Sequence, residues 1–157
     1  MNDIYKILND LNISFTEYTH PPVFTCEEAE KYNRGGAKIK NLFLRNKKGS
    51  KYFLVILEAL KNVDLKSLSE SVDENKLGFA SEERLAKYLN LKTGSVSPFG
   101  LINDKNKEVI VVLDKDLMNC EKLNFHPNMN TATIQISKDD FLKFIEWCGN
   151  KLLIIAI

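Results

Sequence analysis

A lysine in an otherwise apolar run is the first residue in the sequence that could do chemistry. Strand alternation puts Lys40 on the same face as Leu42 and Leu44. Burying an unpaired ammonium is costly, so a lysine on this face fits a cleft that holds an anion. The same pattern also fits an exposed strand start at which the lysine tip reaches water.

A short loop-like segment provides a second candidate. Its residues are Gly94, Ser95, Val96, Ser97, Pro98, Phe99 and Gly100. Glycine, serine and proline at this density predict a tight loop with exposed backbone N–H groups, which can cradle a carbonyl, carboxyl or phosphate oxygen. An ordinary connecting loop has a similar composition, so the segment alone does not decide between the two.

A histidine at a predicted strand end is the third candidate. His126 lies between Phe125 and Pro127, and the proline restricts the backbone around it. Such a histidine can donate a hydrogen bond to a substrate or act as an acid or base near neutral pH. A purely structural histidine remains the alternative.

Well-known catalytic and metal-binding motifs are absent from the sequence. It contains no P-loop, GxSxG, HExxH or GxGxxG pattern. The three cysteines, Cys26, Cys120 and Cys148, form no CxxC pair and no zinc spacing with the two histidines. We therefore expect no metal, no cofactor and a reducing compartment.

The elements that must position these residues follow from apolar periodicity and turn signals. Helices are expected over 4–11, from Thr25 to about Tyr32, near 65–68, over 81–89 and from Ser137 onward. Strands are expected over 13–18, 39–44, 52–57, 109–113, 123–125, 131–136 and 152–157. Hairpin connections dominate, so the fold class is α+β, a curved mixed sheet of about seven strands with surrounding helices.

Length and charge limit the classes of function. The 157 residues make one domain, spanning 1–157, and 22 basic against 21 acidic residues leave a net charge of +1. This balance argues against coating of long nucleic acid, although it allows contact with one nucleic-acid end. The sequence shows no membrane span and no signal peptide, so we expect a cytoplasmic protein.

Together, the three segments resemble the prolyl-tRNA editing family, which comprises the YbaK-like deacylases and the editing insertion of bacterial prolyl-tRNA synthetase. The resemblance rests on the runs at 40–44, 94–101 and 125–133 and extends over about residues 3–147. The opening His20-Pro21-Pro22-Val23-Phe24-Thr25 is similar to the free-standing ProX or PrdX branch. The implied fold is that of a YbaK-like editing domain.

This resemblance implies a deacylase that acts in trans on mischarged Ala-tRNA(Pro) by hydrolysing the aminoacyl ester. The family's lysine corresponds to Lys40, which is expected to be catalytic, and its neighbour is Asn41. The family's GxxxP loop corresponds to Gly94 to Pro98, and its histidine before proline corresponds to His126. These last residues are expected to bind the substrate, and Phe24, Leu42 and Val96 are candidates for narrowing the pocket.

Several alternatives remain open at this point. The YbaK branch implies Cys-tRNA(Pro), other small amino acids also fit, and a non-catalytic module that binds a tRNA end or an unrelated hydrolase with the same fold is possible. The expected partner is the acceptor end of tRNA(Pro), gripped by Lys40 with Lys38, Arg45 and Lys47. Prolyl-tRNA synthetase or an elongation factor would be transient partners of a monomer or weak dimer. The run at 151–157 has no assigned role.

Overall fold

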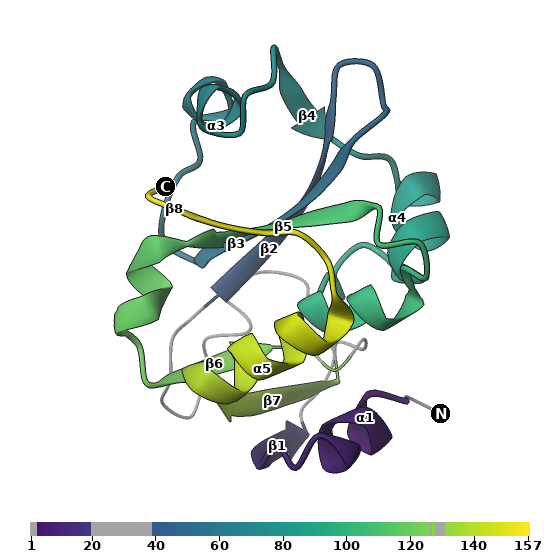
Figure 1. Cartoon of the computed structure of the whole chain (residues 1–157), viewed down its shortest axis with the longest axis vertical. Helices are drawn as coiled ribbons and strands as arrows, with labels where there is room; N and C mark the ends of the chain where they lie inside the picture. The colour runs from purple at the N-terminus through teal and green to yellow at the C-terminus, as the bar shows by residue number, and fades with distance from the viewer. Residues whose placement is uncertain (1–2, 20–38, 126, 128–130) are drawn as a thin grey trace.

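The structure is a computed structural model that describes residues 3–19, 39–125, 127 and 131–157 (Figure 1). Its helices are α1 (Ile4–Asp10), α3 (Leu65–Ser71), α4 (Glu82–Leu89) and α5 (Lys138–Cys148), with 3-10 helices η1 (Pro98–Asn103) and η2 (Lys115–Asn119). Its strands are β1 (Phe15–Thr19), β2 (Ile39–Asn46), β3 (Tyr52–Glu58), β4 (Leu77–Phe79), β5 (Val109–Asp114), β6 (Lys122–Phe125), β7 (Ala132–Ser137) and β8 (Leu152–Ile155). The helix expected from Thr25 to Tyr32 lies outside the described residues.

The larger sheet has the strand order β4-β2-β3-β5-β8. Strands β4, β2 and β3 are antiparallel neighbours, whereas β3, β5 and β8 run parallel. Residues Tyr52 to Leu57 of β3 are all buried, as a central strand covered on both faces requires. The predicted hairpin and central strand are therefore confirmed, and β8 closes one edge of the sheet as expected.

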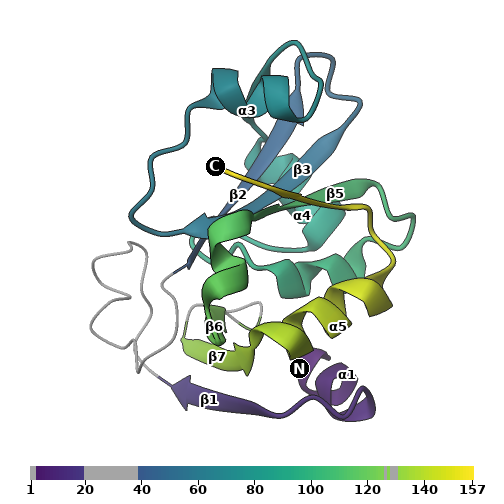
Figure 2. The ribbon, with the colours of Figure 1, turned by 60° about the vertical axis from the view of Figure 1, so that its left-hand side comes forward.

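The smaller sheet has the order β1-β7-β6 and is antiparallel throughout. Helix α5 packs against β6 and β7, and Figures 1 and 2 show it lying alongside this sheet. The main core contains Phe99, Phe141 and Phe144, together with Leu54 and Ile56 from one face of β3. The two sheets therefore share one core on this side of β3.

A second, smaller core covers the opposite face of the larger sheet. It contains Phe53, Val55 and Leu57 of β3 together with Leu44 of β2 and Leu68 of α3. Because β3 contributes alternate residues to the two cores, its lack of polar alternation follows directly from its position. The two cores give the faces of β2 different environments, which matters for the site.

The caps that the sequence predicts are present at three helices. The side chain of Asp64 accepts hydrogen bonds from two N–H groups of α3, Ser81 accepts one from Arg84, and Ser137 accepts one from Asp140. Each interaction satisfies a donor that the first helical turn leaves free. Local chemistry therefore fixes where these helices begin.

Two details differ from the expectations. The α+β class with a mixed sheet is confirmed, but the described part of the chain has eight strands in two sheets. The extra strand, β4, has three residues with a central glycine, and its pairing with β2 at the edge defines it. The expected loop is also shorter, because Pro98 begins η1 and the Ser97 hydroxyl accepts a hydrogen bond from the Phe99 N–H at 3.2 Å.

Among the described residues, none of the helices combines the length and the apolar character that crossing a bilayer requires.

Candidate functional site

Lys40 and Asn41 are neighbours on β2, and their side chains point to opposite faces of the larger sheet. Lys40 pairs with Leu57 and Asn41 pairs with Ile56 across the antiparallel ladder. Directly paired residues share a face; Leu57 belongs to the second core and Ile56 to the main core. The alternation expected from the sequence is therefore confirmed, and the two predicted site residues lie on different sides at the start of β2.

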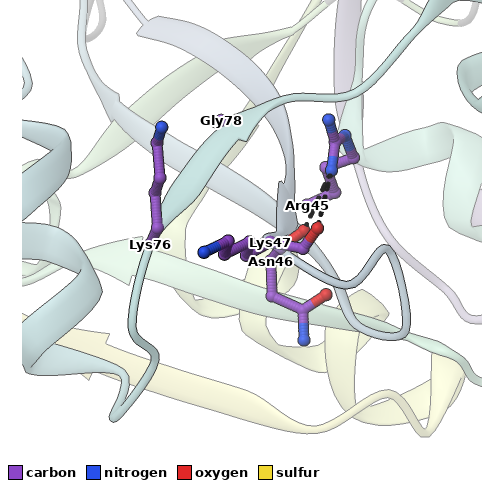
Figure 3. A pocket seen from close by; sticks show the side chains of 5 residues that line it. All are labelled: Arg45, Asn46, Lys47, Lys76 and Gly78. Carbon is purple, nitrogen blue, oxygen red and sulfur yellow. Dashed lines mark hydrogen bonds between the residues drawn. The ribbon is translucent and has the colours of Figure 1, made fainter.

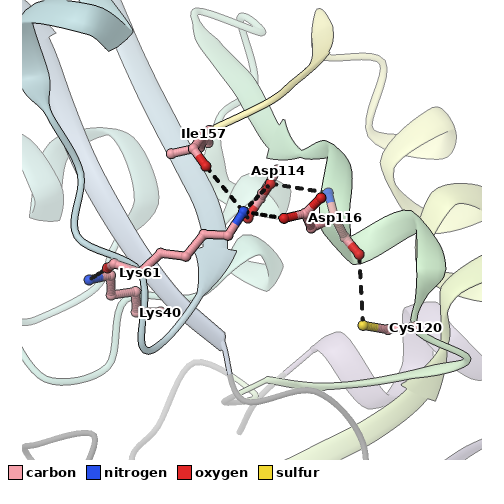
Figure 4. A network of polar contacts seen from close by, with 6 residues as sticks. All are labelled: Lys40, Lys61, Asp114, Asp116, Cys120 and Ile157. Atoms are coloured by element: carbon pink, nitrogen blue, oxygen red, sulfur yellow. Dashed lines mark hydrogen bonds and ion pairs between the residues drawn. The ribbon is translucent and has the colours of Figure 1, made fainter.

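The ammonium of Lys40 is anchored on a neutral acceptor. Its Nζ donates a hydrogen bond to the main-chain carbonyl oxygen of Lys61, in the turn that follows β3 (Figure 4). Lys40 is half-buried, and it forms no ion pair with a carboxylate of the described residues. Because a carbonyl does not neutralise the charge, the group retains its positive charge and two further N–H donors for an anion.

Lys61 itself is held by a cluster of acceptors. Its Nζ lies 3.1 Å from Asp114 Oδ1, 2.9 Å from Asp114 Oδ2, 2.6 Å from Asp116 Oδ2 and 3.1 Å from the main-chain oxygen of Ile157 (Figure 4). The hydrogen bonds that Lys61 donates to Asp114 and then to Asp116 raise its pKa above its usual value. The Asp114 side chain is fully buried, so this contact balances a charge removed from water.

Sequence reasoning did not predict this network. The signal that could have indicated it is the position of charged residues just after two strands. Strands β3 and β5 are parallel, so their carboxyl ends meet at one edge of the sheet. Lys61 follows β3 closely, and Asp114 and Asp116 stand at and just after the end of β5. The contact with Ile157 also gives the unassigned run at 151–157 a structural role beside the turn that holds Lys40.

Asn41 has an unusual hydrogen-bonding state. Its Oδ1 is buried and accepts no hydrogen bond from any residue that the structure describes. A buried acceptor without a donor costs about 1–3 kcal/mol, so such groups are uncommon in folded proteins. The side chain thus presents an unpaired acceptor on the main-core side of the sheet, near the start of β2.

The segment Gly94–Pro98 is partly available as a cradle. The Ser95 N–H donates to the carbonyl of Lys92 at 3.0 Å within a turn in which Gly94 has a φ of +90°. The N–H groups of Gly94 and Val96 donate to no described residue. Ser97 and Pro98 are buried and begin η1. Two of the expected backbone donors are therefore unused among described partners, and a third is occupied.

The end of β6 lies beside this segment. The rings of Phe99, which follows Pro98, and Phe125, the last residue of β6, meet edge to face at 5.7 Å between centroids. Strands β2 and β6 are also in contact. His126 follows Phe125 but lies outside the described residues. Strand β6 thus contacts β2, and its last residue meets the ring that directly follows the 94–98 segment, while Lys40 and Asn41 lie on opposite faces of β2.

The cysteines show no sign of a nucleophile in the described residues. Burial raises the pKa of Cys148 to about 12, so its thiol stays protonated near neutral pH. Cys120 is half-buried at the end of η2. Cys26 lies outside the described residues.

Comparisons with known proteins agree with the resemblance seen in the sequence. Residues 20–144 match the model of the aminoacyl-tRNA editing domain. The chain is 43% identical over 152 residues to the prolyl-tRNA editing protein ProX of Acetoanaerobium sticklandii, covering 96% of this chain and 93% of that protein. It is 35% identical over 159 residues to the mouse prolyl-tRNA synthetase associated domain-containing protein 1, covering 98% and 94% of the two chains.

Solved structures share the fold at low sequence identity. One, described provisionally as a trans-editing enzyme for prolyl-tRNA synthetase, superposes with a TM-score of 0.73 at 15% identity and covers 98% of this chain and 94% of its own. Another, of a hypothetical protein, has a TM-score of 0.74 at 15% identity, with 96% and 97% coverage. With the family model matching most of its length, this chain belongs to the aminoacyl-tRNA editing domain family.

Proposed function

We propose that this protein is a trans-acting deacylase that hydrolyses the ester between a wrong amino acid and the 3′ end of tRNA(Pro), with alanine as the amino acid removed. The observation that carries the proposal is the 43% identity to a prolyl-tRNA editing protein over nearly the whole of both chains. Family membership supports the reaction class, and the charged Lys40 at the candidate site supports catalysis over simple binding.

The reaction needs little from the protein, because an aminoacyl ester is already activated. Water adds to the carbonyl carbon, the ester C–O bond breaks, and the proton lost by the water reaches the departing ribose oxygen. The free amino acid and the deacylated tRNA are the products. The protein must hold the ester, place the water and stabilise the developing oxyanion.

The site residues divide these tasks. Lys40 stabilises the developing negative charge or holds the terminal phosphate, with the N–H groups that the Lys61 carbonyl leaves free. The unpaired Oδ1 of Asn41 accepts a hydrogen bond from the aminoacyl group. The backbone of Gly94 and Val96 faces the carbonyl oxygen, and His126 binds the terminal ribose.

Catalysis is assisted by the substrate in this mechanism. The free hydroxyl of the terminal ribose orients the attacking water, which removes the need for a protein base. A tRNA whose free 2′-hydroxyl is replaced by hydrogen or fluorine should therefore be deacylated much more slowly than the natural substrate. Deacylation of the modified tRNA at the normal rate would contradict this step.

Selection of alanine is a steric problem. A pocket that admits a methyl group excludes larger side chains by clash, which discriminates more sharply than rejecting smaller ones. Val96, within the 94–98 segment, packs at the edge of the main core, whereas Leu42 shares the opposite face with Lys40, and Phe24 lies outside the described residues. Val96 is therefore the better placed of these two residues to limit the size of the pocket.

A deacylation assay tests the proposal directly. Wild-type protein and Lys40→Ala are compared on tRNA(Pro) charged with Ala, Cys, Ser and Pro, with Lys6→Ala on an exposed face of α1 as the matched control. We expect hydrolysis of Ala-tRNA(Pro), a loss of about 10²-fold or more in Lys40→Ala, and no change in the control.

Each other outcome has a defined meaning. A preference for Cys-tRNA(Pro) would mean that the amino acid removed is cysteine and not alanine. Binding of tRNA without hydrolysis of any charged form would identify a non-catalytic module, and full activity in Lys40→Ala would remove the role of the lysine.

A further inference from the structure

A basic hollow lies at the opposite end of β2 from Lys40. It has a cavity volume of about 100 Å³. Its lining residues are Arg45, Asn46, Lys47, Lys76 and Gly78. Figure 3 shows that the three cationic side chains come from the end of β2, the hairpin turn and the chain just before β4.

No carboxylate of the described residues balances the positive charges in this hollow. Arg45 Nη1 donates to the carbonyl oxygens of Asn46 and Lys47 at 3.2 and 3.3 Å, which fixes the guanidinium without neutralising it. Neither Arg45, Lys47 nor Lys76 forms an ion pair within the described part of the chain. The nearby Glu74 is occupied by Lys51 at 3.3 Å and by Asn46 Nδ2 at 3.0 Å.

The concentration of charge is local. Residues 45–51 contain four cations and no acid, in a chain whose basic and acidic residues number 22 and 21. An arginine fork beside flexible lysine ammonium groups is well suited to a phosphate, which accepts several charged hydrogen bonds at once. The hollow therefore has the charge and donors of a phosphate site.

Gly78 keeps the hollow open. A Cβ built at this position would meet no heavy atom within 4 Å, and the residue has no positive φ that would require glycine. Gly78 pairs directly with Arg45 across the β2–β4 ladder, so its missing side chain would stand on the same face as the guanidinium. A side chain introduced at position 78 would therefore occupy open space on the guanidinium's face of the sheet.

The hollow also has a fixed relationship to the candidate site. Arg45 and Asn41 are four residues apart on one strand, so they share a face at a separation of about 13 Å. About four stacked nucleotides, at roughly 3.4 Å each, span that distance. The hollow therefore lies within the reach of a few nucleotides from the candidate site.

We propose that the hollow formed by Arg45, Lys47, Lys76 and Gly78 binds a backbone phosphate of the substrate tRNA, a few nucleotides from the aminoacylated end. The proposal rests on the proposed function, because tRNA is taken as the substrate. It assigns the hairpin end of β2 a part in holding the acceptor strand while the other end of β2 faces the ester.

The first test removes charge. Lys47→Ala/Lys76→Ala is compared with Lys6→Ala/Lys143→Ala, whose lysines are exposed on α1 and α5 at the far side of the molecule (Figure 1). Affinity for uncharged tRNA(Pro) is measured by fluorescence anisotropy between 0.05 and 0.3 M salt. Loss of one phosphate contact should weaken binding by about five- to eightfold near 0.1 M salt and reduce the log–log salt slope by about 0.7–0.9.

The second test uses a matched pair in the hollow itself. Gly78→Asp and Gly78→Asn differ by one charge at nearly equal size, and both have room for the side chain. The aspartate should weaken tRNA binding by several-fold more than the asparagine. In deacylation, KM should likewise be higher for the aspartate variant than for the asparagine variant, and kcat should not change. Both variants should retain the wild-type circular dichroism spectrum.

The outcomes separate the two proposals. Weaker binding in the Lys47/Lys76 variant than in its control, with aspartate worse than asparagine at position 78, supports the phosphate site even if no charged tRNA is hydrolysed. Equal effects in the hollow variants and the control variants overturn it, as does a fall in kcat without a change in KM. Binding of inorganic phosphate in the hollow with no effect on tRNA also overturns it.

Discussion

The ammonium of Lys40 donates a hydrogen bond to the carbonyl oxygen of Lys61, and the ammonium of Lys61 in turn contacts two aspartates. The turn after β3 is thus held through its backbone by one lysine and through its side chain by the buried Asp114. A lysine at the candidate site consequently depends on a charge cluster built from β5 and the chain near Ile157. This dependence makes Lys61 a positioning residue for Lys40.

Substitution of Lys61 by alanine should affect both stability and turnover. Asp114 is left buried beside no cation, which should lower the free energy of unfolding by about 2 kcal/mol. The turn loses its side-chain anchor, so Lys40 loses a fixed partner and kcat should fall about tenfold while KM changes little. Chemical denaturation and steady-state deacylation measure the two effects.

Two further variants separate positioning from stability. Lys61→Arg keeps the charge and should restore most of kcat, whereas Lys61→Met/Asp114→Asn removes the unpaired charge and should restore stability but not kcat. Because the pKa of Lys61 is raised in the fold, its contribution to stability is full below its unfolded pKa of about 10.5. That contribution is lost only as the pH rises through the higher folded value. A wild-type kcat in the double variant would contradict the positioning role.

Asn41 should show a conflict between stability and function. Asn41→Leu removes a buried acceptor that has no donor among the described residues, so the free energy of unfolding should stay level or rise by about 1 kcal/mol. Deacylation should nevertheless fall by at least tenfold, because the substrate loses its partner on this face. Thermal unfolding and kcat/KM are measured on the same preparation. Destabilisation with unchanged activity would show that the amide is structural.

Gly100 should tolerate no side chain. A Cβ there would lie 2.7 Å from Leu91 Cδ1 and 3.1 Å from the Leu89 carbonyl oxygen, so Gly100→Ala forces η1 away from the end of α4. We expect a loss of about 2 kcal/mol in stability and lower activity, because η1 begins at Pro98, the last residue of the 94–98 segment. Gly78→Ala is the control, since its Cβ meets open space, and it should change stability by less than about 0.5 kcal/mol.

Much of the fold could be predicted from local sequence signals. The uninterrupted apolar run at 52–57 indicated a buried central strand, and side-chain caps at Asp64, Ser81 and Ser137 indicated helix starts, because these features depend only on nearby residues. Strand β4 was missed because Leu77–Phe79 has too few residues for a periodic pattern, and its pairing with β2 is long-range.

The site could be predicted only in part, for a similar reason. Lys40 and Asn41 are candidates because of their strand and family pattern, and the alternation predicted for their side chains is confirmed. The acceptor of the Lys40 ammonium could not be predicted, because the Lys61 carbonyl is a backbone group in a turn with no distinctive composition. The unpaired state of Asn41 likewise depends on which donors the folded chain leaves out of reach.

Alkylation should distinguish the cysteines of the described residues. Burial raises the pKa of Cys148 to about 12, so at pH 8 only about one thiol in 10⁴ is ionised. Peptide mapping after brief iodoacetamide treatment should therefore find Cys148 unmodified in the folded protein and fully modified in denaturant. The half-buried Cys120 serves as the internal reference and should react faster. Modification of Cys148 at the rate of Cys120 in the native state would show that α5 does not protect it.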